Sequence, residues 1–136
     1  MNGDLTSPGE KVMIEISDTL EGSEPGYRTF HDILLDGKKI GKVNVGYIGK
    51  EDLKTFKRSK RKLKVGQPFG VQVFIDSVES KVSASDLGFE GFKELSDRLK
   101  EKLKGLEDRD IFIMEVTPSR KKIVGRWDKL LDQGHL

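Results

Sequence analysis

The sequence predicts one α+β domain, a mixed and mostly antiparallel β-sheet with a central strand–helix–strand crossover. Asp36-Gly37 separates two apolar runs and indicates a hairpin, because both turn residues tolerate positive φ. Residues 71–78 form an apolar run that suits a central strand. An amphipathic segment and a further apolar run follow it, an order typical of two parallel strands joined by a helix.

The first half of the chain reads as strands and turns. Residues 1–11 have little apolar content, so we expect a flexible lead-in before a single domain at 12–134. Alternation and β-branched residues predict strands at 12–16, 27–35 and 40–48. A charge run with three breaker residues interrupts this pattern between residues 50 and 70.

The second half alternates strands with helices. After Gly88, apolar residues recur at helical spacing, and Glu94 and Arg98 form a favourable pair one turn apart. The apolar positions of this helix are Phe92, Leu95, Leu99 and Leu103. We expect a strand at 110–116 and a last helix at 119–133, built on Ile123, Val124, Trp127, Leu130 and Leu131.

Composition excludes several classes of protein. The 136 residues contain no Cys, which excludes disulfide scaffolds, thiolate metal sites and cysteine nucleophiles. Only two His are present, so we expect no metal site. No apolar run approaches the roughly 20 residues of a membrane span, and the N-terminus lacks the features of a signal peptide. We therefore expect a cytoplasmic protein without membrane contact.

The segment 116–131 leads from a strand into a helix that carries the pattern Trp127-Asp128-Lys129-Leu130. Together with the order of elements, this segment resembles the GCN5-related N-acetyltransferase (GNAT) superfamily. The resemblance runs from about Tyr27 to Gly134 and is clearest at residues 116–131. Trp127, Lys129 and Leu130 stand at the Tyr, Lys and Leu positions of a Tyr-x-Lys-Leu-Gly-like pattern. The resemblance implies a GNAT-like fold and an acyl-CoA-dependent N-acyltransferase that uses acetyl-CoA and an amine substrate.

The family's acyl-CoA motif, Arg/Gln-x-x-Gly-x-Gly/Ala, places small residues where pyrophosphate approaches amides at a helix N-terminus. Ser85, Gly88 and Glu90 stand at its three defined positions, so only the first Gly is retained. Glu90 would repel an anionic ligand, and Trp127 cannot replace the tyrosine acid. The resemblance places the cofactor beside Val78, Val82, Ser85, Gly88, Phe89, Arg120 and Trp127.

Two carboxylates are candidates for the general base. The resemblance implies a Glu after the fourth strand that deprotonates the attacking amine, and Glu79 lies there. Glu115, near the end of the next strand, is the second candidate. Chance placement is the alternative, because the chain has 23 acidic residues.

Residues 54–64 contain seven cations. They either contact a polyanion, such as a nucleic acid, CoA phosphates or an acidic protein, or form a solvated loop or edge. The candidate polyanion-binding residues are Lys57, Arg58, Lys60, Arg61 and Lys62. A second basic cluster, Arg120, Lys121, Lys122 and Arg126, is expected at the start of the last helix.

Two functional alternatives stay open beside the enzyme: a non-catalytic GNAT-like binding or regulatory module, and a nucleic-acid-binding protein. The departures at Ser85, Glu90 and Trp127 favour the first of them. In the family, two more strands usually follow the segment that residues 116–131 resemble. If a second copy of the chain supplied these strands, the protein would be a homodimer. His31 is expected to be a hydrogen-bonded structural residue.

Overall fold

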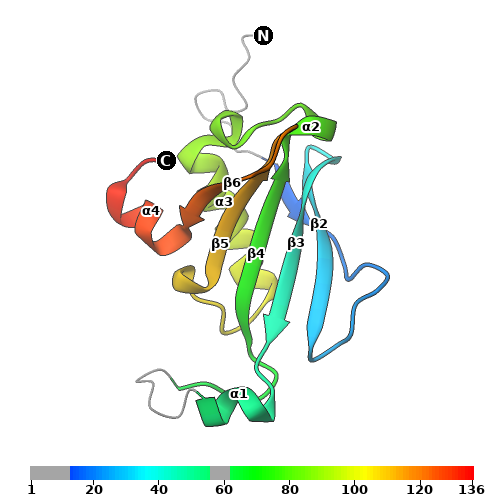
Figure 1. Ribbon diagram of the computed structural model, residues 1–136, viewed down its shortest axis with the longest axis vertical. Coiled ribbons are helices and arrows are strands. Elements are labelled where there is room, and N and C mark those ends of the chain that lie inside the picture. The colour runs from blue at the N-terminus through cyan, green and yellow to red at the C-terminus, as the bar shows by residue number, and fades with distance from the viewer. Residues whose placement is uncertain (1–12, 56–61) are drawn as a thin grey trace.

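The computed structural model describes residues 13–55 and 62–136, which form one six-stranded sheet with its larger helices on one face (Figure 1). The strands are β1 (Ile14–Ile16), β2 (Arg28–Leu35), β3 (Lys38–Tyr47), β4 (Pro68–Asp76), β5 (Ile111–Val116) and β6 (Lys121–Arg126). The helices are α1 (Lys50–Thr55), α2 (Ser77–Ser80), α3 (Ala84–Lys102) and α4 (Trp127–Gln133), with a 3-10 turn, η1, at Asp108–Asp110.

The strands lie in the sheet in chain order, from β1 to β6. All neighbours are antiparallel except β4 and β5, which are parallel and joined through α3. This confirms the mixed, mostly antiparallel sheet and its crossover. It also confirms the hairpin between β2 and β3, whose turn residues Asp36 and Gly37 have φ values of 51° and 83°.

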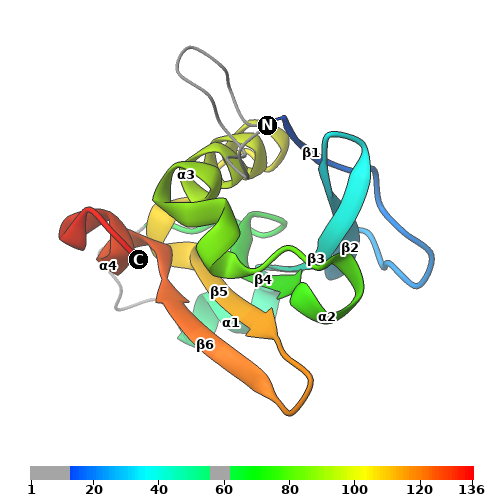
Figure 2. The same ribbon diagram turned by 90° about the horizontal axis from the view of Figure 1, so that it is seen from above.

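The core lies between one face of the sheet and the helices α3 and α4, which Figure 2 shows on the same side. Alternate strand residues such as Val43, Val73 and Ile113 are at most 1% exposed on this face. They meet the apolar side of α3, including Phe92 and Leu99. No helix in the described ranges is long and apolar enough to cross a membrane.

The opposite face of the sheet, which we call the open face, carries the alternating partners of these core residues. Strand register assigns to it Arg28, Phe30 and Asp32 of β2, Lys42, Asn44 and Gly46 of β3, Gly70, Gln72 and Phe74 of β4, Phe112 and Met114 of β5, and Lys121 and Ile123 of β6. Neither α3 nor α4 covers this face (Figure 2).

Helix α3 begins at a capping box. The Ser83 hydroxyl accepts a hydrogen bond from the Asp86 N–H, and the Asp86 carboxylate accepts one from the Ser83 N–H. The helix is interrupted at Gly88, whose φ of 67° and ψ of −178° are not helical. Its expected ion pair is present, with 3.0 Å between Arg98 Nε and Glu94 Oε2.

The predicted helix at 119–133 is wrong over its first half. The chain turns at Thr117, where the side-chain hydroxyl and backbone N–H both donate to the Arg120 carbonyl, and returns as β6. Helix α4 starts only at Trp127. The second basic cluster therefore lies on the β5–β6 turn and on β6, where Arg120 and Lys121 are exposed, rather than on a helix.

The strand predicted at 71–78 begins earlier and ends at Asp76. The Asp76 carboxylate accepts hydrogen bonds from the N–H groups of Val78 and Glu79, at 3.1 and 3.0 Å, and so caps the short helix α2. Ser77 and Val78 belong to that helix. The charge run after β3 also contributes a short helix, α1.

Candidate functional site

The parallel strands β4 and β5 end together at Asp76 and Val116, which face each other in the register. The chain leaves β4 through α2 and enters α3, so the first turn of α3 lies at the same end of the sheet (Figure 1). In sheets with parallel strands, ligands bind outside the carboxyl ends of those strands. This end, which we call the crossover end, is the first candidate site.

The first turn of α3 would supply the amides for an anion at the crossover end. The first amides of a helix have no partner within the helix, but the capping box already satisfies those of Ser83 and Asp86. The amides of Ala84 and Ser85 remain for a ligand. The helical conformation is interrupted at Gly88. The space beside its Cα is open, since a Cβ there would have no neighbour within 4 Å.

The predicted cofactor residues are divided between the surface and the core. Ser85 is exposed, and Gly88 and Phe89 follow it in the same helix. The Phe89 ring lies 5.4 Å from that of Trp127, which is 1% exposed, so Trp127 belongs to the core. The remaining residues are Val78 on α2 and Val82 before α3, both half-buried, and Arg120 on the β5–β6 turn, which projects away from α3 (Figure 2).

The two candidate bases differ in environment. Glu79 is exposed on α2, whereas Glu115 of β5 is 7% exposed on the core face, paired in the register with Lys122 of β6. Both lie at or near the crossover end. Within the described residues, no group of three or more His, Asp or Glu side chains could hold a metal ion.

The pairing of β4 with β5 continues without interruption from Val71–Ile111 to Asp76–Val116. The backbone edges of the two strands are therefore occupied by each other along this whole length. A ligand at the crossover end would contact the strand ends and the start of α3, and would not enter between the strands.

The predicted polyanion-binding segment is described only in part. Lys57, Arg58, Lys60 and Arg61 lie outside the described residues. Lys62 is exposed, and so is Lys54 on α1, whose ammonium lies 3.6 Å from the Glu51 carboxylate.

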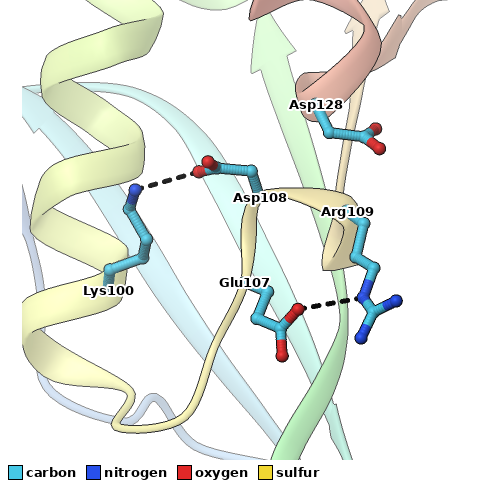
Figure 3. A pocket seen from close by; sticks show the side chains of 5 residues that line it. All are labelled: Lys100, Glu107, Asp108, Arg109 and Asp128. Atoms are coloured by element: carbon cyan, nitrogen blue, oxygen red, sulfur yellow. Dashed lines mark hydrogen bonds and ion pairs between the residues drawn. The ribbon is translucent and has the colours of Figure 1, made fainter. Parts of the chain in front are cut away.

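A depression between α3, η1 and α4 is lined by charged side chains, shown in Figure 3. Lys100 Nζ lies 2.9 Å from Asp108 Oδ1, and Arg109 Nε lies 3.0 Å from Glu107 Oε1. The fifth lining residue, Asp128, pairs with Arg126. Because these charges neutralise one another, we assign the depression a structural role.

The Arg126–Asp128 pair shifts both ionisations. The guanidinium hydrogen bond holds the pKa of the Asp128 carboxyl below its ordinary value, and the same bond raises the pKa of Arg126. Asp128 also lies in the first turn of α4, where a negative charge is favourable.

His31 is a structural residue, as predicted. It is 3% exposed, with Nδ1 2.9 Å from the Ser17 carbonyl oxygen and Nε2 3.0 Å from the Thr29 hydroxyl. The Tyr47 hydroxyl lies 2.8 Å from Thr29 Oγ1. A neutral imidazole satisfies this chain, because Nδ1–H donates to the carbonyl and Nε2 accepts from Thr29.

Sequence reasoning missed a depression of about 310 Å³ on the open face. Gly46 and Gly70 face each other in adjacent strands and leave bare backbone at its floor. Its other lining residues are Arg28, Phe69, Val71, Gln72, Asp110 and Phe112. Two-residue alternation along the strands could have placed several of them on one face, although it could not have shown which face stays uncovered.

Comparison with protein-family models, with curated proteins and with solved structures finds no match to this chain.

Proposed function

We propose that this chain is an acyl-CoA-dependent N-acyltransferase with a GNAT-like fold, and that acyl-CoA binds at the crossover end. The observation that carries the proposal is the placement of the α3 N-terminus at the carboxyl ends of the parallel strands β4 and β5. Helix amides and the helix dipole attract the phosphates of such a ligand. The antiparallel strands β2 to β4 before the crossover match the order of elements on which the resemblance rests.

The reaction requires a neutral amine and a leaving thiolate. The amine nitrogen attacks the thioester carbon, the C–N bond forms, the C–S bond breaks, and a carboxylate takes the proton released by the amine. Glu115 and Glu79 are the bases we propose for this step. CoA leaves with its sulfur protonated by solvent, because the indole of Trp127 is neither acidic nor exposed.

The test is a calorimetric titration of acetyl-CoA into the full chain, with CoA and ATP as comparison ligands. We expect micromolar binding that prefers acetyl-CoA to ATP. A panel of amines is then screened for CoA release. The proposal is overturned if acetyl-CoA does not bind and no amine releases CoA.

The base is assigned with matched variants. Glu115→Gln or Glu79→Gln should lower kcat by about 10²–10⁴-fold without changing the affinity for acetyl-CoA, since the amide cannot accept the proton. Glu21→Gln, an exposed loop substitution, is the control. Equal activity of all three variants would remove both candidate bases.

A second candidate function is a non-catalytic binding module with the same fold. The capping carboxylate of Asp86 and the continuous β4–β5 pairing favour it, because both reduce what the crossover end offers an acyl-CoA. Absence of acetyl-CoA binding in the titration would support this candidate. Its partner would then be an acidic protein or a nucleic acid.

A further inference from the structure

We propose that the open face of the sheet binds single-stranded nucleic acid, and that its depression takes one base. The depression lies at the starts of β4 and β5, about 20 Å along β4 from the crossover end. The proposal therefore does not depend on acyl transfer, and it uses no residue of the basic segment 54–64.

The shape of the depression suits a flat ring. Register places the Arg28–Gly46–Gly70 row beside the Asn44–Gln72–Phe112 row. The two glycines remove side chains from the floor, and the half-buried Phe112 supplies an aromatic ring beside them. Bases stack on such rings regardless of sequence, because every base has a π-face.

Polar groups at the rim suit the edge of a base. Arg28 donates to the Asn44 side-chain oxygen at 2.8 Å, and Asn44 Nδ2 lies 3.4 Å from Gln72 Oε1. This arrangement leaves the Gln72 NH₂ and further guanidinium donors of Arg28 for a ligand. Asp110 also lines the depression, and its negative charge disfavours a phosphate inside it.

Charge along the rest of the open face suits a phosphate backbone. Lys42 and Lys121 are exposed there, and Lys121 Nζ lies 5.1 Å from the centre of the Phe74 ring. Asp32 of β2 lies on the same face and is offset by Lys39, whose Nζ is 3.3 Å from its carboxylate, and the carboxylate of Asp76 at the end of β4 accepts hydrogen bonds from the α2 amides. Phe74 and Phe112 lie on adjacent strands of the same face, so this face offers two aromatic rings, with two cations beside the first of them.

The experiment measures binding of fluorescently labelled poly-U and poly-A strands of about 12 nucleotides to the full chain by anisotropy. We expect binding that weakens steeply between about 50 and 200 mM salt and that prefers single strands to the duplex. Gly70→Val fills the depression, and since a Cβ at Gly70 meets nothing within 4 Å it should fold normally. It should weaken binding roughly tenfold.

Two further variants keep the test independent of that substitution. Phe112→Leu keeps an apolar side chain but removes the ring, so it should weaken binding by a similar factor. Lys42→Gln should reduce the slope of log affinity against log salt by about 0.7, whereas Lys93→Gln, on the exposed side of α3, should leave it unchanged. Circular dichroism checks the fold of each variant.

Four results would overturn the proposal. The first is absence of binding at low salt, and the second is binding that Gly70→Val, Phe112→Leu and Lys42→Gln leave intact. The third is equal affinity for the duplex or for poly-glutamate, which would show that charge alone attracts the ligand. A dimer that Gly70→Val disrupts would assign the open face to a second copy of the chain and overturn it as well.

Discussion

Among the glycines that the structure describes, Gly41 of β3 is the one at which an added Cβ would come closest to the backbone of a neighbouring strand. A Cβ at this position would overlap the backbone carbonyl oxygen of Phe74 in β4 and lie 3.2 Å from the Ile75 Cα. Backbone in a paired strand cannot move away as a side chain can. Gly41→Ala should therefore lower the free energy of unfolding by about 3 kcal/mol, measured by urea denaturation.

Gly70→Ala is the matched control for that substitution. Gly70 lies in β4, and a Cβ there meets nothing within 4 Å. Because alanine restricts the unfolded chain more than glycine does, this variant should be neutral or up to about 1 kcal/mol more stable. Equal losses in the two variants would contradict the packing described for β3 and β4.

The Arg126–Asp128 pair gives stability a pH dependence. Because folding lowers the pKa of the Asp128 carboxyl, its contribution is complete above the ordinary carboxyl pKa, about pH 4, and is lost as the pH falls through the lowered value. Asp128→Asn should therefore be slightly less stable than the wild type at pH 7.

Thermal unfolding at a series of pH values measures this difference. We expect the two melting curves to converge as the pH falls below about 4. Asp97→Asn, which changes an exposed acid on α3, serves as the control and should show no such convergence. A difference that stays constant down to acid pH would exclude the ion pair as its cause.

At the start of α3, helix stability and ligand binding compete for the same backbone amides. Ser83→Ala or Asp86→Ala removes half of the capping box and should cost about 1 kcal/mol, measured by urea denaturation. If acyl-CoA binds at the crossover end, Asp86→Ala should also tighten its binding, because it frees the Ser83 amide and removes a negative charge. Asp97→Ala should change neither quantity.

The same element shows how much the sequence alone could predict. The spacing of Phe92, Leu95 and Leu99 predicted α3, and Asp36-Gly37 predicted the β2–β3 hairpin, because these signals are local. The last segment was misread since Ile123, Val124 and Trp127 also fit helical spacing. Ile123 is in fact 67% exposed on β6, and the turn at Thr117–Arg120 was the local signal that the spacing obscured.

The candidate sites could not be predicted from local patterns, because they are formed by residues far apart in the sequence. Alternation assigns Gln72 and Phe112 to a face of their own strands, but only the register places them beside each other and beside Gly70. In the same way, the resemblance implied that Trp127 lies beside a cofactor, but its packing against Phe89 places this residue in the core. The sequence therefore predicted which residues of a strand share a face, but it did not predict which residues of other elements lie beside them.

The single tryptophan tests whether the fold unfolds as one unit. Trp127 lies on α4, near the C-terminus, yet it belongs to the same core cluster as Ile14 of β1 and Val73 of β4. A core shared between the two ends of the chain favours one cooperative transition. Tryptophan fluorescence and far-ultraviolet circular dichroism should therefore give coincident urea unfolding curves.

The variant Leu130→Ala sharpens this test. Leu130 is a buried residue of α4, so its truncation should lower the stability by about 2–3 kcal/mol and move both curves together. A fluorescence transition that precedes the dichroism transition, in the wild type or in the variant, would show that α4 opens independently. The prediction of one domain at 12–134 would then fail at its C-terminal end.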